Sequence, residues 1–131
     1  MELIVVVIII GILATLGYTH YGTYQEKTLD REAQANLLLI LAAERIARLE
    51  SNDNLYPGHG GNNTNTGINT LLKMTLPTTN PKWNYTLSNR NASANFCAQA
   101  ARNWTRTAKY FSIYSPNSTI PDPQPQSGQC R

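Results

Sequence analysis

The sequence predicts an α+β protein in which one long N-terminal helix packs on a small antiparallel sheet. Residues 1–50 contain no proline and are rich in residues that favour helices. Three short stretches after residue 82 alternate apolar with polar side chains, which is the pattern of strands with one buried face. The helix is the available cover for that face. The chain thus divides into residues 1–25 and 26–50, the two halves of the helix, and residues 51–131, a globular head.

The two halves of the predicted helix differ in polarity. No side chain between Glu2 and Glu26 carries a formal charge, with His20 counted as neutral. In the second half, Glu44 and Arg48 have the spacing of a favourable i, i+4 pair. Apolar residues at i, i+4 and i+7 or i+8 predict a stripe that faces the sheet: Leu29, Ala33, Leu37, Ile40, Leu41 and Ala47. At 1.5 Å per residue the whole helix would be roughly 75 Å long.

The charge-free run from Leu3 to Tyr24 approaches the roughly 20 residues that cross a bilayer, although only Leu3–Leu16 is strongly apolar. No basic segment or small-residue cleavage site accompanies the run, so we expect it to be retained as a membrane segment. Three glycines each weaken a helix by about 1 kcal/mol relative to alanine. They are candidates for a helix break, with close helix packing at small residues as the alternative: Gly11, Gly17 and Gly22.

The predicted head begins with a loop-rich connection over residues 51–81. Within it, residues 68–76 form an apolar patch whose secondary structure the sequence does not decide. Three strands are predicted over residues 83–88, 94–102 and 109–115, with one apolar face each. Four prolines between residues 116 and 129 predict an extended surface segment that ends at Cys130.

Charge and cysteine content constrain the chemistry of the head. Residues 1–50 carry six acids and four bases, net −2, whereas residues 51–131 carry two acids and seven bases, net +5. The two cysteines, Cys97 and Cys130, follow a membrane-like segment in an Asn/Thr/Ser-rich region, which favours a disulfide. Two free thiols are the alternative. A disulfide would close a loop of about 34 residues and contribute roughly 3 to 4 kcal/mol.

The residue inventory argues against catalysis, metal binding and a cofactor. The two histidines, His20 and His59, have no acid placed beside them by a recognised motif, and no Cys/His spacing matches a metal site. We therefore expect no enzyme. Nucleic acid is a weaker possibility, because the net charge of +5 over residues 51–131 could attract it and Trp83, Trp104 or tyrosines could stack on bases. Arg102 and Arg106 are the residues whose replacement by alanine would test it. A solvated basic surface is the favoured interpretation.

The opening sequence MELIVVVIIIGILATL closely resembles the N-terminal signature of type IV pilins and of their pseudopilin relatives. In that family a methylated Phe begins the mature chain, a Glu follows a few residues later, and an apolar run with a Gly comes next. Glu2 and Gly11 match the Glu and the Gly, and Tyr21 and Tyr24 match two tyrosines common further along, so the match covers about the first 24 residues. The family's Phe does not appear at the start of this sequence, and Thr19 stands where a proline is common.

The resemblance implies how this chain would assemble. Glu2 would pair with the N-terminal amine of a neighbouring subunit, because a buried carboxylate is tolerated only when it is paired. The apolar side chains after it would anchor the subunit in the membrane and then form the filament core: Leu3, Ile4, Val5, Val6, Val7, Ile8, Ile9, Ile10, Gly11, Ile12 and Leu13.

The resemblance also implies a cellular role. The subunit would sit in the bacterial inner membrane, and the pilus assembly machinery would build it into an extracellular homopolymer for adhesion, motility or DNA uptake. A pseudopilin or minor pilin of a type II secretion-like system is the alternative. The major pseudopilin typically binds calcium through C-terminal carboxylates and lacks the disulfide. After Asp53 this chain offers only Asp122, and it has both Cys97 and Cys130, which favours the pilin.

Overall fold

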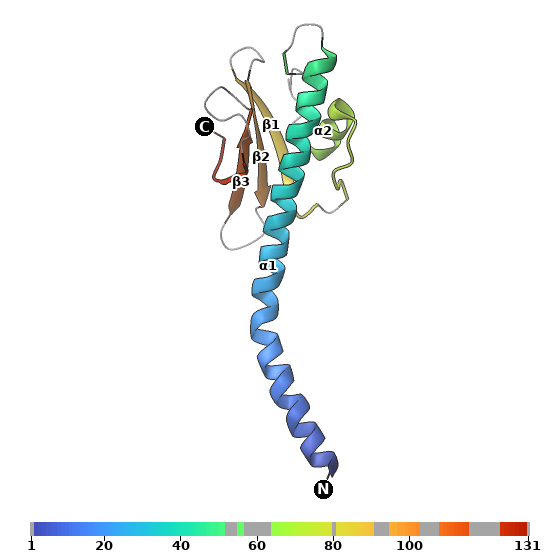
Figure 1. The fold of residues 1–131 in the computed structure, drawn as a ribbon, viewed down its shortest axis with the longest axis vertical. Helices are drawn as coiled ribbons and strands as arrows, with labels where there is room; N and C mark the ends of the chain where they lie inside the picture. The colour runs from blue at the N-terminus through green and yellow to red at the C-terminus, as the bar shows by residue number, and fades with distance from the viewer. Residues whose placement is uncertain are drawn as a thin grey trace. The chain divides into compact units, whose positions relative to one another are not determined.

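The computed structural model describes residues 2–51, 55–56, 64–79, 81–90, 95–102, 108–115 and 124–130, without the side chains of residues 16–20, 89 and 90. The elements in chain order are α1 (Glu2–Glu50), α2 (Asn65–Leu72), β1 (Asn84–Arg90), β2 (Asn95–Arg102), β3 (Lys109–Tyr114) and β4 (Gln126–Ser127) (Figure 1). A long helix on a four-stranded antiparallel sheet confirms the predicted α+β class. The chain divides into two compact units, residues 1–32 and 33–131.

Helix α1 is continuous from Glu2 to Glu50. It therefore has no interruption at Gly11, Gly17 or Gly22, and the predicted helix break is not observed. The physical reason is that a single glycine costs only about 1 kcal/mol and does not remove a backbone donor, as a proline would. The alternative role of these glycines, close packing against another helix, stays a prediction.

The sheet has the order β1-β2-β3-β4, with every neighbouring pair antiparallel. Its register aligns side chains in rows across one face. Ala98 in the central strand lies opposite Leu87 and Ile113, and Ala100 lies opposite Tyr85 and Phe111. Small alanines between large neighbours leave space above the middle of the sheet, where a helix can approach closely.

The second half of α1 fills that space in the unit formed by residues 33–131. Ala33, Leu37, Ile40 and Leu41 are buried in one cluster with the apolar side chains of the sheet, and Ala47 packs at its edge. The predicted stripe is thus confirmed at these positions. The remaining stripe residue, Leu29, belongs to the unit formed by residues 1–32 and is half-buried. Asn36 also joins α1 to the sheet, because its Nδ2 donates a hydrogen bond to the Tyr85 hydroxyl at 2.8 Å.

Two charged side chains lie inside the same unit. Glu44 has an exposed fraction of 0%, and Arg102 is nearly as buried. The guanidinium carbon of Arg102 lies 5.1 Å from the centre of the Trp83 ring, a cation–π distance. The sequence predicted Glu44 as a member of a helix-surface pair with Arg48, and its complete burial was not foreseen.

The undecided patch at residues 68–76 belongs in part to helix α2. Thr64 caps the helix, because its hydroxyl accepts a hydrogen bond from the Gly67 N–H at 3.2 Å. The amide of Asn65 then links three segments: Nδ2 donates to the carbonyls of Pro77 (2.7 Å) and Trp83 (3.1 Å), and Oδ1 accepts from the Tyr85 N–H (2.8 Å). This buried side chain holds α2 against the start of β1.

The C-terminal segment was predicted as an extended surface segment without a strand. It instead adds strand β4 to the edge of the sheet. Ser127 and Gln126 pair with Phe111 and Ser112 of β3. The chain then turns at Gly128, whose φ of 137° suits a residue without a side chain. Cys130 reaches back to β2 and forms the predicted disulfide with Cys97, with the two Cα atoms 6.0 Å apart.

Candidate assembly surface

The first turns of α1 present an apolar surface with almost no polar interruption. The large side chains from Leu3 to Leu13 are between 52% and 78% exposed. They are Leu3, Ile4, Val5, Val6, Val7, Ile8, Ile9, Ile10, Ile12 and Leu13. Soluble monomers rarely expose contiguous apolar patches larger than a few hundred Å². This segment is therefore a candidate surface for contact with another apolar surface.

The free energy available from covering this segment is large. Complete burial of one Val, Leu or Ile side chain contributes about 1.5 to 3 kcal/mol. Each of the ten side chains is between about half and three-quarters exposed, so covering the exposed part contributes roughly 1 kcal/mol or more per side chain. Together they could supply on the order of 10 kcal/mol, before the entropy of association is subtracted.

Residues 2–15 contain two polar side chains, Glu2 and Thr15, and Thr15 is satisfied by a hydrogen bond within the helix. The Thr15 hydroxyl donates to the Gly11 carbonyl at 2.8 Å, one helical turn earlier. Thr28 makes the same type of bond to the Tyr24 carbonyl at 2.9 Å, and Gln25 donates to the Tyr21 hydroxyl at 3.1 Å. A hydroxyl bonded within its own helix costs little when its surroundings become apolar.

Glu2 is the other polar side chain of residues 2–15. It lies in the first turn of α1, where the helix dipole favours a negative charge. Within the described part of the chain it is exposed and forms no ion pair or hydrogen bond. Covering the neighbouring apolar side chains would remove water from this carboxylate, so the surface that covers it must supply a positive group or a donor.

Among the described residues, no helix is long and apolar enough to cross a membrane.

The structure brings together only some of the other residues singled out in the sequence. Cys97 and Cys130 are joined, and Cys97 is completely buried. Trp83 and Arg102, suggested for nucleic acid, are buried against each other and do not form an exposed stacking platform. The side chains of His20, His59, Trp104 and Arg106 lie outside the described residues. Within the described residues, no group of three or more His, Cys, Asp or Glu side chains could hold a metal ion.

Sequence reasoning missed one exposed feature of α1. Beyond the core stripe, the helix carries further apolar side chains that are exposed, including Leu39, Ile46 and Leu49. The signal is present in the sequence, because these residues repeat at spacings of three and seven, but a single apolar stripe is all that packing on one sheet requires.

No protein-family model, curated protein or solved structure matches this chain. The architecture by itself is pilin-like: a long N-terminal helix packs on a four-stranded antiparallel sheet, and a C-terminal disulfide closes the head.

Proposed function

We propose that this chain is the structural subunit of a type IV pilus, a helical homopolymer assembled through its apolar N-terminal helix. The observation that carries the proposal is the exposed segment from Leu3 to Leu13, which follows a lone carboxylate on a helix of pilin-like architecture. Such a surface is stable in water only when it is covered, and identical helices cover one another when they bundle.

Glu2 would supply the register of the filament. An incoming subunit with an unpaired carboxylate in an apolar bundle is strongly disfavoured, whereas a carboxylate beside the N-terminal amine of a neighbour is tolerated. The ion pair adds little net stability, but it penalises every axial position in which carboxylate and amine do not meet. The apolar side chains would drive association, and Glu2 would select one arrangement.

Before assembly, the same apolar segment would hold the subunit at the inner membrane. Its transfer into the filament would exchange a lipid environment for a protein environment of similar polarity. The free-energy difference of that exchange is small, so directional growth requires separate assembly machinery that supplies the energy. The head would surround the apolar core, with its disulfide formed in an oxidising compartment.

The disulfide between Cys97 and Cys130 supports the pilin over the pseudopilin. The resemblance associates a closed C-terminal loop with pilins and C-terminal calcium ligands with the major pseudopilin. Type IV pilin therefore stays the first proposal.

Electron microscopy of sheared cell-surface material, with mass spectrometry to identify the chain, tests the proposal. The wild-type chain should form thin fibres that contain this subunit. Glu2→Ala should abolish or greatly reduce fibres while the subunit stays folded and membrane-bound. Glu32→Ala is the matched control, because it removes another exposed carboxylate from the same helix and should leave fibres unchanged. Normal fibre yield from Glu2→Ala would contradict the role of Glu2, and absence of wild-type fibres would contradict the pilus.

A further inference from the structure

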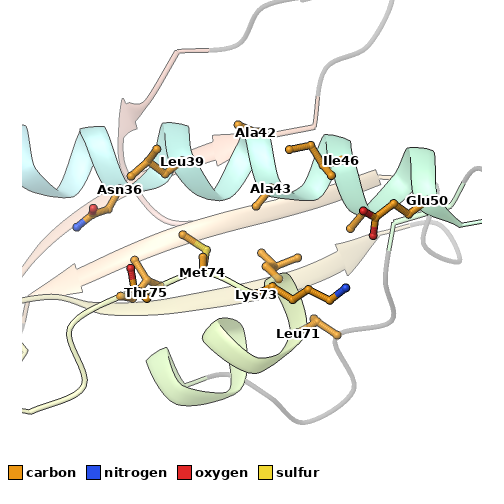
Figure 2. A pocket seen from close by; sticks show the side chains of 13 residues that line it. Asn36, Leu39, Ala42, Ala43, Ile46, Glu50, Leu71, Lys73, Met74 and Thr75 are labelled. Carbon is orange, nitrogen blue, oxygen red and sulfur yellow. The ribbon is translucent and has the colours of Figure 1, made fainter.

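A groove of about 550 Å³ runs beside α1 in the unit formed by residues 33–131. Figure 2 shows Leu39, Ala42 and Ile46 of α1 on one wall, with Leu71 and Met74 on the other. Polar side chains lie at the two ends of the groove: Asn36 and Thr75 at one, and Glu50 and Lys73 at the other. The middle of the groove is therefore apolar, and its long axis follows the helix.

The α1 wall has the residue spacing of a helix–helix interface. Ala35, Leu39, Ala42, Ile46 and Leu49 are separated by four, three, four and three residues, which is the 3.5-residue period of paired helices, and the middle three of them line the groove. Leu39 and Ile46 are 58% and 57% exposed, so the core of their own chain does not cover them. We call these five residues the outer stripe. A surface with this period fits another helix better than it fits a strand or a small molecule.

The composition of the groove favours an uncharged apolar helix that approaches closely. Alanines at positions 42, 43 and 47 line it, and small side chains allow a second backbone to approach closely. A charged side chain in its apolar middle would lose water without gaining a partner.

One segment of this chain is such an uncharged apolar helix. Between Leu3 and Leu13, α1 is apolar around its circumference and uncharged, and a Cβ atom at Gly11 would meet no other atom within 4 Å. This segment and the groove wall are parts of the single helix α1, and a helix does not pack alongside itself. The occupant must therefore come from a different molecule.

We propose that the groove is an intersubunit site that receives the Leu3–Leu13 segment of a second copy of this chain. The inference rests on the proposed filament and deepens it, because it assigns the N-terminal helix a receiving surface on the head of a neighbour. Leu39 and Ile46 of the outer stripe, together with the alanines that line the groove, contact the incoming helix. The polar residues at the groove ends confine it to the apolar middle.

Photo-cross-linking of the full chain tests which segment lies in the groove. A benzophenone side chain is placed at position 46 of isotopically heavy chains, which are mixed with light chains before assembly. We expect cross-links from position 46 to peptides between residues 3 and 13, joining heavy chains to light ones. Cross-links confined to other peptides, or a yield no higher than from a benzophenone at position 66, would overturn the proposal. Position 66, on α2, is exposed and does not line the groove.

A pair of variants measures the effect of the groove on assembly. Ala42→Glu keeps a good helix former at an exposed position, so the subunit should fold normally, but it places a carboxylate in the covered groove. An unpaired buried charge should reduce assembly by about a hundredfold or more. Thr66→Glu adds the same charge in the first turn of α2, outside the groove, and should assemble as the wild type does.

The outcomes separate this proposal from the filament itself. Fibres with no cross-link to residues 3–13, or normal fibres from Ala42→Glu, would overturn the groove and leave the filament. Cross-linked oligomers of the wild-type chain that never grow into fibres would support the groove and overturn the filament. A chain that forms neither fibres nor these cross-links would overturn both.

Discussion

Removal of the disulfide between Cys97 and Cys130 should destabilise the head by an amount that the loop length determines. The bond closes a loop of 34 residues, because the two cysteines are separated by 33 positions. In the chain-entropy model, opening such a loop lowers the free energy of unfolding by about 4 kcal/mol at 25 °C. That is a large part of the 5 to 15 kcal/mol typical of small domains.

The two cysteines should not be equivalent when they are replaced. Cys130 is half-buried, so Cys130→Ser mainly opens the loop and leaves Cys97 as a buried thiol. Cys97 is completely buried, so Cys97→Ser also places a hydroxyl in the interior, at a further cost of about 1 to 3 kcal/mol. The expected order of stability is wild type, then Cys130→Ser, then Cys97→Ser.

Urea unfolding in mild detergent, followed by tryptophan fluorescence, measures this order, because the buried Trp83 becomes exposed on unfolding. With a slope of about 2 kcal/mol per molar urea, loss of 4 kcal/mol moves the midpoint down by about 2 M. Reduced wild type should match Cys130→Ser, and reductant should not change Cys130→Ser further. A Cys130→Ser midpoint equal to that of oxidised wild type would refute the loop-closure reasoning.

Three further predictions test other parts of the structure. Asn65→Leu should lower the free energy of unfolding by roughly 2 to 4 kcal/mol in the same urea assay, because it leaves the Tyr85 N–H without its acceptor and the carbonyls of Pro77 and Trp83 without their donor; an unchanged midpoint would contradict the linking role of this amide. Lys73→Gly should raise stability by up to about 1 kcal/mol in thermal melting, because Lys73 adopts the left-handed φ of 51° after α2; a lower melting temperature would contradict it. Gly11→Ala should stabilise the helix by about 1 kcal/mol, so the helicity measured by circular dichroism should stay the same or rise. If a neighbouring helix packs closely at Gly11, the same variant should reduce fibre yield; normal fibres would show that close packing there is not required.

Local sequence patterns were sufficient for the main elements of the fold. The absence of proline over residues 1–50 predicted one helix, and α1 spans Glu2–Glu50. Alternation over residues 83–88, 94–102 and 109–115 predicted strands that lie within two residues of β1, β2 and β3. These elements are long enough to show their own period, so their identity does not depend on distant contacts.

The missed elements depend on distant contacts. Strand β4 contains only two residues, and it exists because β3 offers an edge to which Gln126 and Ser127 pair. Helix α2 is eight residues long, too short for a clear apolar period, and Asn65 stabilises it through partners 12 to 20 residues away. No pattern within either segment contains that information.

The candidate site divides in the same way. The exposed segment from Leu3 to Leu13 could be predicted, because its apolar character is a property of consecutive residues. The groove could not, because its second wall comes from Leu71 and Met74, whose position beside α1 depends on α2 and on the residues after it. The outer stripe was visible in the sequence, but only the structure separates it from the core stripe.

The two apolar stripes of α1 argue that folding alone does not explain this helix. Packing on the sheet requires one stripe, and Ala33, Leu37 and Ile40 provide it. A helix whose second face met only water would gain solubility from polar residues there, at no cost to the core. Instead Leu39 and Ile46 are apolar and exposed, on the same helix that begins with an exposed apolar segment. Both surfaces would lose their unfavourable contact with water in the proposed filament, so the proposed assembly would account for what the fold of one chain leaves unexplained.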